Sequence, residues 1–183
     1  NNTVLVTGPG SLWRSGSSLY GGSATTHVGY YGSGNSLVIS NGGTVDNPAG
    51  KIGVFPTSTD NSVLVTGADS LWANTKYLTV GASGSGNSLV ISNGGIVSAG
   101  QSIIGSAAGG SNNTVLVTGA GSLWTNRARS IEQNGGLIVG SIGSGHSLVI
   151  SNGGKVYNVN GYIGYVSSNN SVLVTGEGSL WTN

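Results

Sequence analysis

Cysteine and methionine are absent from this chain of 183 residues. Without cysteine there is no disulfide framework, no thiol nucleophile and no thiolate metal site. Charged residues are also scarce, at 6 %, and the net charge is only +1. The chain therefore lacks the clustered basic surface that binding to nucleic acid or to an anionic membrane requires, and we expect no nucleic-acid partner.

Long hydrophobic runs are missing as well. No apolar stretch approaches the roughly 20 residues of a membrane span, and no charged-then-apolar leader opens the chain. We expect a mature or excised soluble segment with no membrane span. Glycine is abundant, with 35 residues, and short runs of Val, Leu and Ile recur at regular intervals. This regularity favours an ordered fold over a flexible linker.

The regular intervals form a repeat with a unit of about 26 residues. Runs of the type NTVLVTG, each followed by SLW, alternate along the chain with a sister run, SLVISNGG. A fixed period of this length indicates a solenoid. The units begin 33, 26, 26, 26, 33 and 24 residues apart, at Asn2, Asn35, Asn61, Asn87, Asn113, His146 and Asn170.

The two longer units carry their extra residues in the same place, between a Trp and the next Val-Gly pair, at 14–27 and 125–138. We expect both insertions to protrude from one side of the molecule. A longer repeat is also present, with a super-repeat at 1–111 and a partial copy at 112–183. The whole chain, 1–183, is therefore predicted to be a single solenoid segment.

Each unit contains three short β signals separated by Gly, Asn and Ser. The first is a VLVT or LVIS run, the second ends in Trp or Val, and the third ends in Val-Gly or Ile-Gly. A strand of four or five residues cannot bury its apolar face alone, but equivalent strands stacked about 4.8 Å apart share a continuous core. The pattern predicts an all-β fold, a parallel β-helix (β-solenoid) of about seven turns with three short strands per turn.

Alternation along each strand separates inward from outward side chains. Val63 and Val65 point one way, whereas Leu64 and Thr66 point the other. We expect the valines to face inward, because burying the hydroxyls would leave unpaired polar groups. In the second strand, Lys155 marks an outward column, so the residues that follow this column face the core. This core ladder alternates indole rings with valines, which keeps the packed volume constant. It consists of Trp13, Val45, Trp72, Val97, Trp124, Val156 and Trp181.

The outward face of the first strand is a candidate interaction ribbon. Two columns of Ser and Thr flank a column of Leu and Val over a length of about 30 Å. A contiguous exposed apolar stripe marks an interaction site, so the ribbon predicts adhesion or lateral self-association. Ice binding by the hydroxyls is a less favoured alternative, because the central column is aliphatic and varied. The residues singled out are Thr7, Val38, Ser40, Leu64, Thr66, Val90, Ser92, Leu116 and Thr118.

The corner that opens each unit carries a column of Asn, which we expect to form a ladder of side-chain amides. His146 interrupts this column. We expect it to be a substituted corner residue rather than a metal ligand, because no second His lies at a neighbouring level. The NGG corners at Asn41, Asn93 and Asn152 are predicted to supply the positive φ angles of tight turns.

An enzymatic function needs a separate test, because parallel β-helices also host polysaccharide lyases and hydrolases. Glycoside hydrolysis requires two carboxylates about 5 to 9.5 Å apart. No two acidic residues of this chain share a column on adjacent levels. We therefore expect no catalytic site, no metal site and no cofactor. The acidic residues are Asp46, Asp60, Asp69, Glu132 and Glu177.

The insertions keep a carbohydrate function open as the alternative. Tyr20, Tyr30 and Tyr31 would serve as stacking platforms for sugar rings. Arg127 and Arg129 belong to the densest charge cluster, which is either a solvated loop or a ligand contact. The alternative function is therefore a carbohydrate-binding or polysaccharide-degrading β-helix.

Several blocks of the repeat resemble a known family. The segment SIGSGHSLVISNGGKVYNVNGYIGYVSSNNSVLVTGEGSLWTN at 141–183, the GGTV and GGIV runs that begin at Gly42 and Gly94, and the G-x-GSLW blocks are similar to the type V secretion and PEP-CTERM associated repeat family. Asp69 departs from the second Gly of that last block. The resemblance implies a right-handed β-helix in a passenger region of an autotransporter-like or surface-anchored bacterial protein, displayed outside the cell. It implies no active site.

Neither end of the chain carries a polar cap, and uncapped solenoid ends expose strand edges that pair readily. We expect a section of a longer rod or copies that stack end to end. The expected partners are other copies of the chain, lateral or end to end, or a glycan or protein on a host or environmental surface.

Overall fold

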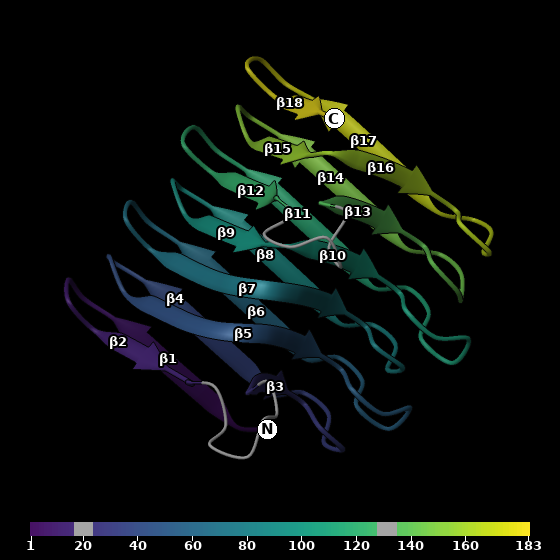
Figure 1. The fold of residues 1–183 in the computed structure, drawn as a ribbon, viewed down its shortest axis with the longest axis horizontal. Coiled ribbons are helices and arrows are strands. Elements are labelled where there is room, and N and C mark those ends of the chain that lie inside the picture. Colours follow the sequence, from purple (N-terminus) through teal and green to yellow (C-terminus); the bar gives the residue numbers. More distant parts are fainter. Residues whose placement is uncertain (17–23, 128–134) are drawn as a thin grey trace.

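The computed structural model of the protein is a stack of coils (Figure 1). It describes residues 1–16, 24–127 and 135–183, and within these ranges the chain forms 18 β-strands and no helix. Successive coils lie side by side, with the two chain ends at opposite ends of the stack (Figure 1). The prediction of an all-β parallel β-solenoid is confirmed, with about six turns of about 26 residues, close to the seven expected.

The first strand of each coil joins a parallel sheet of seven strands, which we call the first sheet. Every neighbouring pair is in register over five residues, so that Leu64 lies beside Val38 on one side and Val90 on the other. The strands of this sheet, in spatial order, are β1 (Thr3–Thr7), β4 (Ser36–Ser40), β6 (Ser62–Thr66), β8 (Ser88–Ser92), β11 (Thr114–Thr118), β14 (Ser147–Ser151) and β17 (Ser171–Thr175).

The second and third segments of the coils share one parallel sheet of 11 strands, the second sheet. Two coils depart from the expectation of separate second and third strands, because there the segments run on as one long strand, β5 or β7. The strands of this sheet, in chain order, are β2 (Leu12–Arg14), β3 (Thr25–Val28), β5 (Thr44–Ile52), β7 (Leu71–Val80), β9 (Ile96–Ala99), β10 (Gln101–Ile104), β12 (Leu123–Asn126), β13 (Gly136–Val139), β15 (Lys155–Asn158), β16 (Asn160–Ile163) and β18 (Leu180–Thr182).

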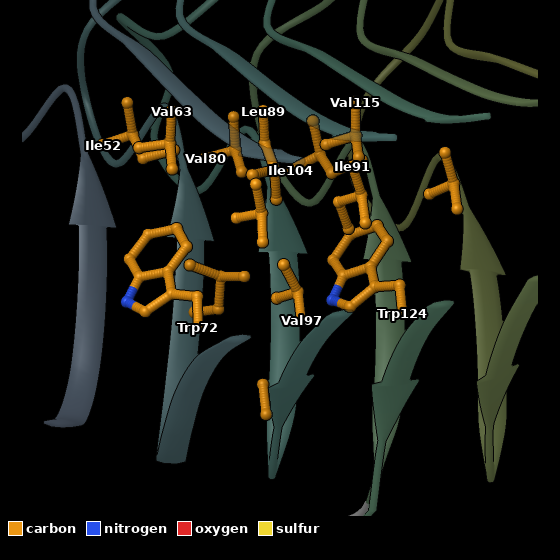
Figure 2. Packing of buried hydrophobic residues seen from close by; sticks show 14 of the residues in the cluster. Ile52, Val63, Trp72, Val80, Leu89, Ile91, Val97, Ile104, Val115 and Trp124 are labelled. Atoms are coloured by element: carbon orange, nitrogen blue, oxygen red, sulfur yellow. The ribbon is translucent and has the colours of Figure 1, made fainter. Parts of the chain in front are cut away.

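The hydrophobic core lies between the two sheets. Trp72 and Trp124 are completely buried, and Val97 lies between their rings along the stack (Figure 2). Trp13 and Trp181, on the first and last coils, are partly exposed. The inward residues of the first sheet and of the third segments complete the core opposite and beside this ladder.

Each buried indole ring packs against a small inward residue of the preceding coil. Figure 2 shows the rings of Trp72 and Trp124 extending from their own strands toward that coil. A Cβ atom added at Gly50 would lie only 2.5 Å from Cζ2 of Trp72. The inward column that contains Gly50 therefore alternates small residues with leucines, in the order Gly50, Leu78, Ser102, Leu137 and Gly161.

A second Asn column lies inside the solenoid, two residues after each Trp or Val of the core ladder. Nε1 of Trp72 donates a hydrogen bond of 3.0 Å to Oδ1 of Asn47 on the preceding coil. Nδ2 of Asn47 donates in turn to Oδ1 of Asn74 at 2.8 Å. The indole N–H of Trp72 thus finds an acceptor within the core. The column comprises Ser15, Asn47, Asn74, Ala99, Asn126, Asn158 and Asn183.

The corner Asn column that opens the coils also forms a ladder. Oδ1 of Asn61 accepts hydrogen bonds from both the backbone N–H and the side-chain amide of Asn35, each at 2.9 Å. The same double contact joins Asn61 to Asn87 and Asn87 to Asn113. His146 occupies the next position, completely buried, and accepts the backbone N–H of Asn113. This ladder closes the corner between the third strand of one coil and the first strand of the next.

Candidate functional site

The outward residues of the first sheet form a flat surface, which we call the outer ribbon. In register across all seven strands lie two columns of hydroxyl residues and, between them, one column of Leu and Val. The aliphatic column consists of Leu5, Val38, Leu64, Val90, Leu116, Val149 and Leu173. The column on its C-terminal side consists of Thr7, Ser40, Thr66, Ser92, Thr118, Ser151 and Thr175.

The outer ribbon is continuous and uncharged. Its aliphatic side chains are half-buried between their neighbours in the middle of the sheet, whereas Leu5 and Leu173 at its ends are 59 % and 53 % exposed. None of the seven strands contains a charged residue. The outer face of the second sheet differs, because it carries charged residues such as Lys51, Lys155 and the ion pair of Arg14 with Asp46, whose Nε and Oδ2 atoms are 3.0 Å apart.

Hydroxyl groups on the outer ribbon bond to one another in pairs. A Ser Oγ donates to the Thr Oγ1 of the neighbouring strand at 2.9 Å in three places, Ser40 to Thr7, Ser92 to Thr66 and Ser151 to Thr118. The NGG corner amide donates to the same Thr oxygen at 3.2 to 3.3 Å, from Asn41, Asn93 and Asn152. Both lone pairs of these three Thr oxygens, on Thr7, Thr66 and Thr118, are therefore used within the ribbon. The ribbon can be covered by another surface without leaving these acceptors unpaired.

The NGG corners that hold these amides are tight turns. Asn41, Asn93 and Asn152 have φ angles of 50° to 51°. Asn tolerates this left-handed region better than most residues, because its side chain hydrogen-bonds locally. The corner geometry thus aims each amide at the edge of the outer ribbon.

The carboxylates of the described residues are dispersed. Asp46 pairs with Arg14, Asp60 and Asp69 occupy turn positions with φ angles of 56° and 64°, and Glu177 lies in the turn before β18. Within residues 1–16, 24–127 and 135–183, no three His, Cys, Asp or Glu residues lie close enough to hold a metal ion. Glu132 lies outside the described residues.

The insertion contacts predicted from the sequence are only partly described. Tyr20 and Arg129 lie outside the described residues, and Arg127 is exposed just after β12, where its backbone N–H donates to the carbonyl of Ala99. Tyr30 and Tyr31 follow β3 and pack with Phe55, and the rings of Tyr31 and Phe55 are stacked with centroids 4.3 Å apart.

Sequence reasoning missed two groups of residues. The inner Asn column had a signal in the sequence, namely an Asn two residues after most of the Trp and Val residues of the core ladder. A second surface feature, a groove on the outer face of the second sheet, had no such signal, because its residues occupy different positions in their repeats.

Comparisons with protein-family models, with curated proteins and with solved structures find no match. The resemblance to the type V secretion and PEP-CTERM associated repeats stays a prediction from the sequence. In the part of the chain that the structure describes, no helix is long and apolar enough to cross a membrane.

Proposed function

We propose that this chain is a structural, non-enzymatic segment whose outer ribbon pairs face to face with the outer ribbon of a second copy. The observation that carries this proposal is the ribbon itself, seven strands wide, uncharged, with an aliphatic centre and three hydrogen-bonded Ser–Thr pairs along one side. Identical flat sheets with these properties pack against each other as dry interfaces. The regular spacing of about 4.8 Å between strands is matched by the same spacing on a second copy.

The second sheet is a poorer candidate for such pairing. Its outer face also has an aliphatic column, which includes Leu71 and Ile96, but Lys155 interrupts that column. Charges that point outward from a sheet oppose face-to-face association, because they must be desolvated or paired. This difference between the two sheets makes pairing specific for one face.

Ice binding is less well supported than pairing. An ice-binding surface has to offer its hydroxyl oxygens to lattice water, whereas the paired Thr oxygens already accept two hydrogen bonds each. The dispersed carboxylates likewise give little support to the alternative of a polysaccharide-degrading enzyme.

The size of the ribbon sets the strength of the pairing. Five residues at about 3.3 Å and six strand spacings at about 4.8 Å give a face of about 500 Å², or about 1,000 Å² buried on the two copies. Stable interfaces bury about 1,200 to 2,000 Å². We therefore expect weak, reversible pairing that strengthens with every coil added to a rod.

The biological setting is proposed from the resemblance of the repeats. A passenger or stalk segment outside a bacterial cell would hold many copies at high local density, where weak lateral pairing is sufficient to cluster them. Adhesion to a host or environmental surface would use the same ribbon.

Sedimentation equilibrium over a range of protein concentrations tests the pairing. Wild type should shift from monomer toward dimer as the concentration rises. The double variant L64K/V90K places two like charges on each ribbon and should remain monomeric at every concentration. The matched control, L71K/I96K, places the same charges on the outer face of the second sheet and should associate like wild type. A wild type that stays monomeric at millimolar concentration, or a control that associates as poorly as L64K/V90K, would overturn the proposal.

A further inference from the structure

A groove of about 340 Å³ crosses the outer face of the second sheet. It spans four neighbouring strands, β3, β5, β7 and β10, in the half of the sheet formed by the third segments. Thr79 points outward between the inward residues Leu78 and Val80, yet it is only 7 % exposed. Thr79 therefore forms part of the floor, and the side chains around it form the walls.

The walls combine aromatic, amide and cationic groups. Tyr77 and Gln101 are register partners on adjacent strands, and Tyr77 is 38 % exposed. Lys51 is the register partner of Thr79 and also lines the groove. Lys51 forms no ion pair with a carboxylate among the described residues.

A β-bulge brings a second ammonium group to the groove. Between Asn74 and Tyr77 the strand β7 has one residue more than β5 has between Asn47 and Ala49. Such a bulge bends the strand and re-aims a side chain. Lys76, which lies in this bulge, is among the residues that line the groove, and none of the described residues that line it carries a carboxylate.

The lining chemistry matches an acidic sugar chain. An aromatic ring packs against the C–H face of a sugar ring, while hydroxyl and amide groups hydrogen-bond to its hydroxyls. The ammonium group of Lys51, which forms no ion pair with a carboxylate of the described residues, attracts a carboxylate or sulfate on the sugar. The groove crosses several strands, so it suits an extended chain that lies along the solenoid axis.

An aromatic patch extends the same surface toward the first coil. His27 is the register partner of Lys51 and contacts the ring of Tyr30, with centroids 5.0 Å apart. Tyr31, 63 % exposed, stacks on Phe55 beside them. These rings offer a second platform next to the groove for the continuation of a bound chain.

We propose that this groove binds an acidic polysaccharide, with Tyr77 as the stacking platform and Lys51 as the partner of a carboxylate or sulfate group. This site lies on the sheet opposite the outer ribbon and functions independently of pairing between copies.

Isothermal titration calorimetry with three defined probes tests the proposal: oligogalacturonate, oligomers of dextran sulfate and neutral dextran oligomers. We expect binding of one or both acidic probes and none of neutral dextran. K51Q and Y77A should each weaken binding by at least about tenfold, the size expected for one charge-assisted hydrogen bond or one aromatic contact. A preference for oligogalacturonate identifies a carboxylate ligand, and a preference for dextran sulfate identifies a sulfated one.

Two further variants sharpen this test. K155Q removes the same charge from a position outside the groove and should bind like wild type. L64K/V90K, which blocks pairing through the outer ribbon, should also retain binding, so that failure of one proposal is distinguishable from failure of the other. The inference is overturned if no acidic probe binds at millimolar concentration, if neutral dextran binds equally well, or if K155Q weakens binding as much as K51Q while Y77A has no effect. Circular dichroism checks that each variant is folded.

Discussion

At the scale of single residues, the corner ladder shows that a ring nitrogen accepts fewer hydrogen bonds than an amide oxygen. An Asn Oδ1 has two lone pairs and accepts both the backbone and the side-chain N–H of the preceding Asn, as Asn61 does from Asn35. Nδ1 of His146 has one lone pair, which accepts the backbone N–H of Asn113 at 3.3 Å. Nδ2 of Asn113 is consequently buried without a partner. The ring proton is therefore assigned to Nε2, which donates to the carbonyl oxygen of Ile142 at 3.2 Å.

Replacement of His146 by Asn should stabilise the protein at neutral pH. H146N supplies a second lone pair to Nδ2 of Asn113, and satisfying one buried donor is worth about 1 to 3 kcal/mol. Urea denaturation followed by circular dichroism measures the gain in the free energy of unfolding. A variant that is less stable than wild type would show that the ring packs better than the restored ladder.

The advantage of H146N should grow as the pH falls. Burial lowers the pKa of His146, and the hydrogen bond to Ile142 opposes this effect only in part. Below about pH 6.5 the unfolded chain therefore binds a proton at this ring that the folded chain does not, so wild type loses stability as the pH falls toward the lowered pKa. The pKa of His27 is lowered too, by burial and then by the charge of Lys51. Because His27 is present in both proteins, its contribution to the difference in stability between them cancels. A difference in stability that stays constant from pH 7.5 to 5 would contradict this explanation.

At the scale of strands, the inner Asn column explains another unpaired donor. Nε1 of Trp72 and Nε1 of Trp181 each donate to an Asn on the preceding coil, at 3.0 and 2.6 Å. The equivalent position on the coil before Trp124, at the end of β9, is occupied by Ala99, whose side chain has no acceptor. Nε1 of Trp124 is therefore buried without a hydrogen-bond partner. The column therefore has a gap at one coil.

Filling this gap should stabilise the solenoid. A99N places an amide oxygen where Asn47 and Asn158 already accept indole N–H groups, and we expect a gain of about 1 to 3 kcal/mol in the free energy of unfolding. A99L has almost the same shape but no acceptor, so it serves as the matched control and should give no such gain. The measurement is thermal and urea denaturation of both variants. Equal stability of A99N and A99L would show that the hydrogen bond does not form.

The strands of the first sheet were predictable because two periods in the sequence agree. Alternation within a run such as Ser62–Thr66 separates inward from outward residues, and the repeat of about 26 residues stacks equivalent runs in register. Both the core and the outer ribbon follow from these two periods alone.

The second sheet was less predictable because its long strands contain residues that usually end strands. Pro48 lies within β5, opposite the bulge in β7. A proline has no N–H to donate to the ladder, and it is tolerated at a bulge, where the regular pairing is already interrupted. The sequence alone favours a break there. The groove was unpredictable for a related reason, since Lys51, Tyr77 and Gln101 become neighbours only through the register after the bulge.

At the scale of the whole molecule, the two sheets have different outer faces. The first sheet presents the uncharged outer ribbon, and the second presents charged groups and the groove. Pairing through one face would leave the other exposed in every copy, so a bundle of two rods would display the proposed polysaccharide groove on both of its outer sides. The two proposals are therefore compatible in one assembly.

The most direct test of the account is to ask which face meets a second copy in solution. Because the chain has no cysteine, one introduced thiol reports on one position. V90C lies at the centre of the outer ribbon, on β8, the fourth of the seven strands, and I96C lies on the outer face of the second sheet. A bifunctional maleimide with a short spacer should join V90C copies into covalent dimers, in a yield that rises with protein concentration, and should leave I96C monomeric. Equal cross-linking of the two variants, or none of V90C, would contradict the account.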